Sequence, residues 1–189
     1  SAWIVATGIV TAMFALRHPL ESNLVTHVVV QMPLLAISGW QFADSPRSVV
    51  ALGKLNSGGA TGLTLALFVF AFWMLPRSVD GAVQSVALET AKFFTLPMAG
   101  AALAMSWPHL PVLAVAIIKA NTLSMLLFLG WLYSASPFRL CNNYLRSEQD
   151  VLGAALISVA ALLALAQAAR ATIGLGRSAN PNTHTRHPP

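Results

Sequence analysis

Charged side chains are scarce in this sequence. Asp, Glu, Lys and Arg make up 9% of its 189 residues, whereas hydrophobic types make up 56%. A soluble domain carries roughly 25% charged residues, so this chain has too few charges to cover a water-facing surface. The scarcity excludes an ordinary soluble globular protein and favours an integral membrane protein.

Residues of recognisable chemistry are also few. The single cysteine, Cys141, excludes an internal disulfide and a CxxC metal knuckle. The chain has no Walker loop, no G-x-S-x-G elbow and no H-E-x-x-H pair, so we predict that it is not an enzyme. The eleven Lys and Arg residues stand singly between apolar runs, which is typical of membrane loops and predicts no nucleic-acid partner.

Long apolar runs are what the sequence does contain. A helix needs roughly 20 apolar residues to cross a bilayer. The runs therefore predict an all-α polytopic membrane bundle of about six transmembrane helices over residues 1–175, followed by a polar, disordered tail over residues 176–189. The expected spans are Ala2–Leu16, Ser22–Phe42, Ser57–Leu75, Asp80–Trp107, Leu110–Ser134 and Gln149–Gly174.

Short turns and loop charges give a topology. The turns at Pro76–Arg77 and Trp107–His109 predict that the helices on either side of each are antiparallel neighbours. Lys and Arg in the loops favour, by one charge, an orientation with both termini in the cytoplasm. We expect the inner membrane of a bacterium, with the loops Arg17–Glu21 and Phe138–Asp150 on the outer side.

Polar residues recur every four positions in the second apolar run. Asn23, His27 and Gln31 form a stripe that must point into the bundle, because an unpaired polar group in lipid costs free energy. A neutral imidazole binds metals or haem, and the thioether of the neighbouring Met32 suits Cu(I). The alternative is that His27 and Gln31 hydrogen-bond across helices without a metal.

The fourth and fifth runs contain further buried polar candidates. Glu89 and Lys92 are three residues apart and can form an ion pair, or else part of a proton relay. Lys119 and Asn121 lie well inside the fifth run. We predict that the Lys119 ammonium binds the Phe93 carbonyl, which Pro97 leaves without its helical donor.

The six-helix topology brings several of these residues to the outer side. There the loop residue Cys141 is a possible ligand beside the other five, which are His18, Asn23, His27, Glu89 and Lys92. Only His27 lies deep in a predicted span, so a bis-histidine haem is not expected.

Two segments resemble a known family. His27-Val28-Val29-Val30-Gln31-Met32-Pro33-Leu34-Leu35 followed by Ser38-Gly39, and Trp131-Leu132-Tyr133 through Ser147–Gly153, are similar to CtaG-like cytochrome c oxidase assembly factors. In that family a histidine follows the first one four residues later, and Gln31 stands at that place here. No family-like histidines stand around Leu88–Leu96, where Glu89 and Lys92 occur.

The resemblance implies a role in assembling a copper-containing respiratory oxidase, by binding or passing copper. His27 would be the first ligand, with Met32 and His18 as further candidates, and Glu89 and Lys92 would shape the site. The lipid bilayer and other membrane subunits, including a terminal oxidase, would be its partners. One alternative is an accessory or structural subunit of a larger membrane complex, without chemistry of its own. Another is a small haem-bearing or quinone-linked anchor.

Overall fold

The structure is a computed structural model that describes residues 2–43, 56, 58–136, 138, 140–141 and 143–178, with side chains to residue 172. Within these residues every regular element is a helix, so the all-α class is confirmed. Most of the predicted tail over residues 176–189 lies outside the described residues. The elements are α1 (Ala2–Ala15), α2 (Arg17–Glu21), the π-helix η1 (Thr26–Gln31), α3 (Met32–Ala43), α5 (Ala60–Met74), α6 (Pro76–Gln84), α7 (Val86–Ser106), the 3₁₀ turn η2 (Trp107–His109), α8 (Val112–Ala135) and α9 (Arg146–Ser178).

Two of the described helices are long and apolar enough to cross a membrane, α8 and the Arg146–Thr172 part of α9. A third span is obtained if α5 and α6, which meet at 76°, count as one broken helix. Helix α1 is apolar but shorter. The membrane character predicted from composition therefore has structural support, while length and apolarity identify two or three spans among the described residues rather than six.

The fourth predicted run is not one helix. Pro76 starts the separate helix α6, where its fixed φ and missing N–H are tolerated. Ser85 has extended backbone (φ −129°, ψ 121°) and separates α6 from α7. The prediction of one helix from Asp80 to Trp107 was therefore wrong at its start, because residues 80–84 belong to the polar, amphipathic helix α6.

A π-helix interrupts the second run and is explained by Pro33. Pro33 has no N–H to donate to the carbonyl of Val29 four residues earlier. The N–H of Met32 bonds to the carbonyl of His27, five residues back, which is the π pattern. His27 and Gln31 are both buried along this segment.

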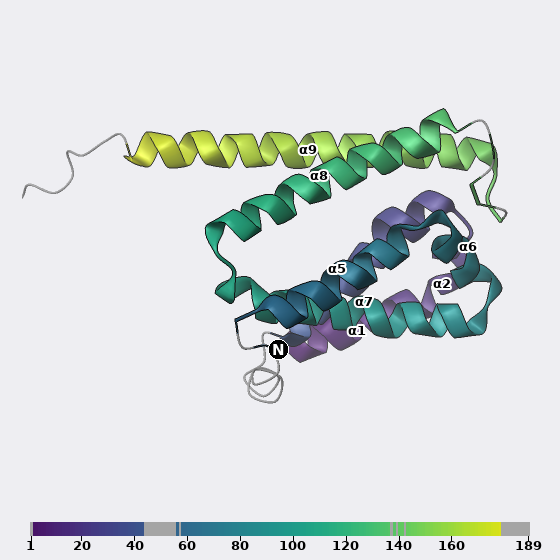
Figure 1. The fold of residues 1–189 in the computed structure, drawn as a ribbon. Helices are drawn as coiled ribbons and strands as arrows, with labels where there is room; N and C mark the ends of the chain where they lie inside the picture. Colours follow the sequence, from purple (N-terminus) through teal and green to yellow (C-terminus); the bar gives the residue numbers. More distant parts are fainter. Residues whose placement is uncertain are drawn as a thin grey trace, which may run out of the picture.

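Helices α1, α3, α5, α6 and α7 form the first packing unit, and Figure 1 shows α1, α5, α6 and α7 together. Helix α3 contacts α7 more extensively than any other helix pair does. Their crossing depends on two glycines. A Cβ at Gly39 would lie 1.8 Å from the Pro97 carbonyl oxygen, and one at Gly100 would lie 1.9 Å from the Ala36 carbonyl oxygen. Small residues at such crossings let two helix backbones approach closely in a membrane.

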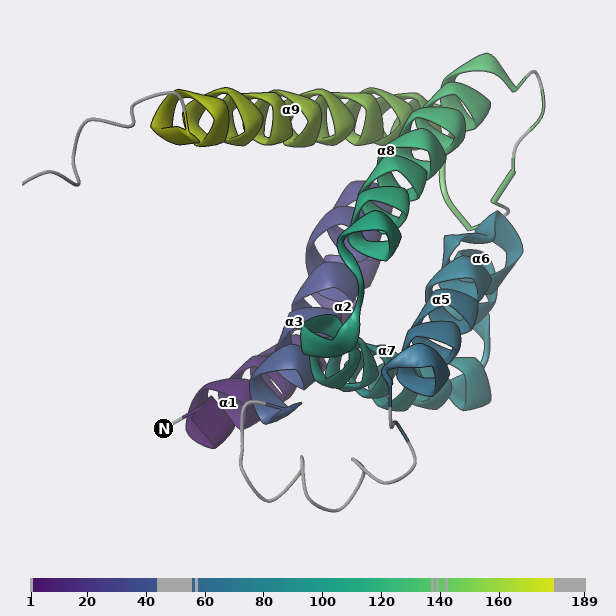
Figure 2. The same ribbon diagram turned by 60° about the vertical axis from the view of Figure 1, so that its left-hand side comes forward.

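Helices α8 and α9 form a second unit, a hairpin that diverges from the first (Figure 2). They cross at Gly130 and Gly153, where a Cβ on Gly153 would lie 2.7 Å from the Gly130 carbonyl oxygen. Helix α8 packs mainly against α9 and leaves α7 after the η2 turn. The prediction that α7 and α8 pair closely across the Trp107–His109 turn was therefore wrong.

The divergence also moves Lys119. Its side chain is exposed on α8 and makes no hydrogen bond to Phe93 within the described part of the chain. The predicted bond from Lys119 to the Phe93 carbonyl was therefore wrong, because it required α8 to remain against α7. Asn121 is exposed on α8 as well.

Candidate functional site

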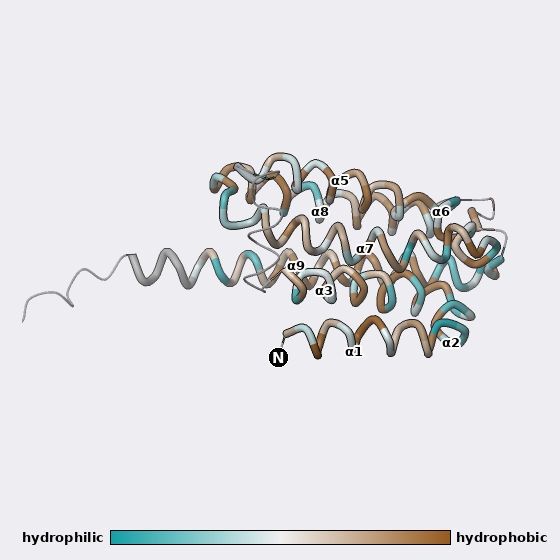
Figure 3. The backbone as a smooth tube through the Cα atoms, turned by 90° about the horizontal axis from the view of Figure 1, so that it is seen from below, coloured by the Kyte–Doolittle hydropathy of each residue, from teal (hydrophilic) through white to brown (hydrophobic). Residues whose placement is uncertain are grey.

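Hydrophilic residues gather at the α2 end of the molecule (Figure 3). Here two ion pairs join α2 to α7. Arg17 Nη1 lies 3.1 Å from Glu89 Oε1, and Lys92 Nζ lies 2.5 Å from Glu21 Oε1. Arg17 and Glu21 are four residues apart and Glu89 and Lys92 are three apart, so each pair of charges shares one helix face. The predicted ion pair between Glu89 and Lys92 was wrong, since each residue binds a partner on α2 instead.

Lys92 is fully buried and fully partnered. Its ammonium donates to Glu21 Oε1, to Gln31 Oε1 at 3.1 Å and to His27 Nε2 at 3.2 Å. An ammonium has three hydrogens, so these acceptors use all of its donor capacity. We call the connected residues the Lys92 network; its members are Glu21, His27, Gln31, Lys92 and Tyr144.

The geometry fixes the proton on His27. The hydroxyl of Tyr144 donates to the carbonyl oxygen of Glu21 at 2.9 Å. The same hydroxyl lies 2.8 Å from His27 Nδ1, so Nδ1 is the donor in that contact. His27 Nε2 then carries no hydrogen and accepts from Lys92. Burial, followed by the negative charge of Glu21, raises the pKa of Tyr144, which keeps the hydroxyl protonated as this arrangement requires.

This arrangement does not fit a copper site. Nε2 of His27 faces a lysine ammonium, which excludes a cation from the same position, and Nδ1 is bound to Tyr144. His18 is exposed on α2, and Met32 lines an apolar cavity rather than the network. Across the described residues, no group of three or more His, Cys, Asp or Glu side chains is placed to hold a metal. Copper binding by His27, Met32 and His18 stays a prediction, and we derive no step from it.

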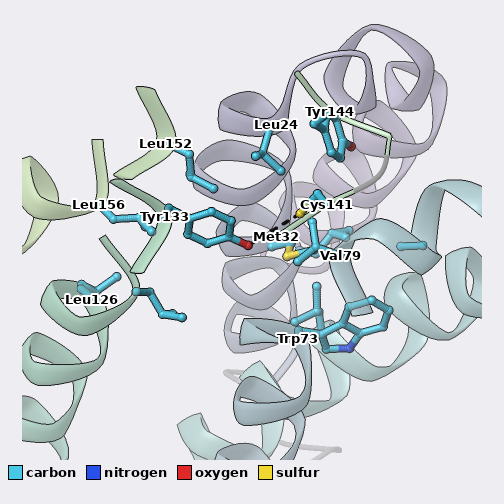
Figure 4. Close-up of a cluster of buried hydrophobic side chains, with 14 of the residues drawn as sticks. Leu24, Met32, Trp73, Val79, Leu126, Tyr133, Cys141, Tyr144, Leu152 and Leu156 are labelled. Atoms are coloured by element: carbon cyan, nitrogen blue, oxygen red, sulfur yellow. Dashed lines mark hydrogen bonds between the residues drawn. The ribbon is translucent and has the colours of Figure 1, made fainter. Parts of the chain in front are cut away.

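Cys141, the possible ligand in the predicted outer loop, lies in the segment between α8 and α9 and is buried. Its Sγ is 3.7 Å from the Pro76 carbonyl oxygen and 4.0 Å from the Tyr133 hydroxyl (Figure 4). Burial raises the pKa of the thiol to about 11, although the Tyr133 hydrogen bond acts in the opposite direction. The thiol is therefore held as a neutral packing group.

We expect Cys141 to resist alkylation in the folded protein. With a pKa of about 11, about one thiol in a thousand is ionised at pH 8, and only the thiolate reacts. N-ethylmaleimide should label folded protein on the order of 10²-fold more slowly than protein unfolded in dodecyl sulfate, and the rate should rise as pH increases toward 10. The control is Ser147→Cys with Cys141→Ser, which places the thiol at an exposed position. Equal rates for folded and unfolded wild type would contradict a buried thiol.

The remaining polar candidates have local roles or no partner. Asn23 is exposed, and its Oδ1 accepts from the backbone N–H of Val25. Lys119 and Asn121 lie on α8, far along the chain from the network. The segment after α8 is tied to the first unit by a second link, in which the Asn143 backbone N–H donates to Asp80 Oδ1 at 2.9 Å.

Sequence reasoning missed Arg17, Glu21 and Tyr144. The first two could have been found, because the basic-acidic spacing of Arg17 and Glu21 complements the acidic-basic spacing of Glu89 and Lys92. Nothing in the sequence marks Tyr144, which reaches His27 across 117 positions of the chain.

The chain matches no protein-family model, and comparison with curated proteins and with solved structures gave no match. The argument for function therefore depends on the described residues.

Proposed function

We propose that this chain is a non-enzymatic accessory subunit of a larger membrane complex and that α8 binds a transmembrane helix of another subunit. The observation that supports the proposal is the exposure of Lys119 and Asn121 within an otherwise apolar span. Neither side chain makes a hydrogen bond or ion pair within the described part of the chain. Polar groups in a membrane span normally face a protein partner or a water-filled cavity.

The depth of the two residues favours a protein partner. At 1.5 Å per residue, Lys119 lies about 10 Å and Asn121 about 13 Å from the start of α8 at Val112. A lysine can extend its ammonium toward the headgroups, but the asparagine amide is too short to do so. Lys119 and Asn121 are two residues apart and point to opposite sides of α8, so one partner helix can face only one of them. A partner helix on the Asn121 side should carry a carboxylate or amide at a matching depth, since those groups bind an asparagine amide.

A second copy of this chain supplies no such acid from its described residues. Glu21 and Glu89 are engaged with Lys92 and Arg17, and Asp80 accepts from Asn143. The acidic residues of α9 lie in its first turns, beside the α8 C-terminus and so at the opposite end of the hairpin from Lys119. A carboxylate partner for α8 would therefore have to come from a different subunit.

The network of buried polar groups supports the non-enzymatic part of the proposal. Every buried side-chain nitrogen and oxygen among the described residues has a hydrogen-bond partner. The Lys92 network therefore joins helices rather than presenting a free acid, base or ligand.

The family resemblance leads us to propose that the complex is a copper-containing respiratory oxidase in a bacterial inner membrane. The proposal also includes six membrane spans in this chain and both termini in the cytoplasm.

We expect the double variant Lys119→Leu/Asn121→Leu to fold normally in detergent but to lose its partner in the membrane. The measurement places a benzophenone amino acid at Ile117, which is exposed on α8, and irradiates intact membranes of the host. Wild type should give one discrete crosslinked protein whose modified peptide belongs to an apolar helix with an Asp, Glu, Asn or Gln. The same group at Phe94, exposed on α7, and the variant Leu127→Ala on α8 serve as controls.

Crosslinks to lipid alone, or a crosslinked partner unaffected by the double variant, would overturn the accessory-subunit proposal. A separate measurement of copper content, wild type against His27→Ala, tests the copper-delivery alternative. Copper held by wild type and lost in the variant would favour that alternative and would require Lys92 to move away from His27.

A further inference from the structure

A cavity of about 360 Å³ separates the two helical units. One wall comes from α3, α5 and α7, and the other from Leu129 and Tyr133 of α8 and Leu156 of α9. Figure 4 shows this boundary, where Tyr133 and Leu156 of the hairpin face Met32, Val79 and Trp73 of the first unit. The cavity arises because the α8–α9 hairpin diverges from α7 while the loop segment holds its far end in place.

The lining offers a ligand few hydrogen-bonding groups. The indole N–H of Trp73 donates to Thr95 Oγ1 at 2.9 Å, and the Tyr133 hydroxyl is directed at Cys141. The indole N–H of Trp40 is a further donor in the lining, and most of the other lining side chains are aliphatic, or are Met or Phe. A quinone ring or a headgroup carries several oxygens and would leave most of them without partners here, at an energetic penalty. The lining favours a purely hydrocarbon ligand.

The volume and length of the cavity indicate which hydrocarbon ligand it could hold. An engineered apolar cavity of about 150 Å³ binds benzene, and this one is more than twice as large. Its lining extends along one helical segment from Val28 to Trp40, twelve residues or about 18 Å. A cavity lined over that length is long enough for a large part of an extended hydrocarbon chain.

We propose that this cavity binds one acyl chain of a membrane phospholipid, with the headgroup left outside at the membrane surface. The inference rests on the proposed membrane location but does not depend on the partner that α8 binds. The occupied cavity would join the hairpin to the first unit at a place where the two helical units make few direct contacts.

The experiment uses the full chain in phosphatidylcholine vesicles that contain a phosphatidylglycerol with a diazirine in its 16-carbon chain. After irradiation, peptides that contain Met32 or Leu129 should be labelled in a saturable way, and unlabelled phosphatidylglycerol should compete. Peptides that contain Phe94 or Leu162, which are exposed, report contact with bulk lipid and should not saturate.

Two variants fill the cavity, Leu103→Trp from α7 and Leu129→Trp from α8, and Leu162→Trp is the matched control on an exposed surface. Saturable labelling should fall at least about tenfold in the first two and stay unchanged in the control, because a filled cavity cannot accept the chain. Delipidation should lower the unfolding temperature of wild type but not that of Leu129→Trp. This comparison stays informative if one filling variant fails to fold.

Two results would overturn the acyl-chain site. One is labelling of Met32 and Leu129 peptides that does not saturate, and the other is labelling that is unchanged in both filling variants. Failure of the chain to insert into vesicles at all, measured by carbonate extraction, would instead contradict the proposed membrane function.

Discussion

The variant Gly39→Ala should lose most of the stability of the first helical unit, although it adds only one methyl group. The new Cβ would sit 1.8 Å from the Pro97 carbonyl oxygen, and backbone on both sides leaves no side chain that can turn away. Helices α3 and α7 would have to separate along their closest crossing. Overpacking usually costs about 1–3 kcal/mol and sometimes more, and we expect the upper end of that range or beyond.

The measurement is thermal unfolding in a fixed detergent, followed by helical circular dichroism. For a protein of this size, about 3 kcal/mol corresponds to a decrease of roughly 6–12 °C in Tm. Gly8→Ala is the matched control, because a Cβ at Gly8 meets nothing within 4 Å. An alanine at position 39 that leaves Tm equal to that of the control would show that α3 and α7 do not cross as described.

Replacing Lys92 by Met should be the most damaging change to the buried polar cluster. The change removes the donor shared by Glu21, Gln31 and His27 and leaves the Glu21 carboxylate with one remaining side-chain donor, Gln31. Breaking a buried ion pair by removing one partner costs about 3–5 kcal/mol, mostly through the charge that stays behind. We expect a loss of stability of that size.

A second substitution separates the lost charge from the lost volume. Because the unpaired carboxylate causes most of the damage, Lys92→Met/Glu21→Gln should regain part of the stability that Lys92→Met loses. Lys119→Met is the control, since that lysine is exposed and should matter little for unfolding of the isolated chain in detergent. A double variant as unstable as the single one would mean that Lys92 contributes through packing rather than through its pairing with Glu21.

The helical class and the positions of the longest helices could be predicted from composition and run length. Helix α8 begins and ends within two residues of the expected Leu110–Ser134 span. The break in the fourth run could not be predicted from hydropathy. Nothing in the hydropathy of the residues around Ser85 marks the extended backbone that separates α6 from α7. Apolar length fixes a helix only where no competing start signal, such as Pro76, lies beside it.

The candidate site could be predicted only in part. A polar residue inside an apolar run identified His27, Gln31 and Lys92, because burying such groups requires partners, but Glu21, Tyr144 and the pairing of the residues were missed. The partners themselves depend on tertiary structure, and so the sequence favoured the nearest opposite charge along α7 over the α2 residues. The predicted contact of Lys119 was wrong for a related reason, since it assumed that consecutive helices stay in contact after a short turn.

The link between Tyr144 and His27 has a consequence for the order in which the protein is made. Residues 2–43 leave the ribosome long before the segment that follows α8, yet His27 and the Glu21 carbonyl obtain a hydrogen-bond partner from that late segment. Asp80 likewise obtains a donor from Asn143. The early helices thus insert with these three polar contacts unmade, and the segment between α8 and α9 completes them. The contacts of the early helices are therefore completed by residues 143 and 144 of the 189, once α8 has been made.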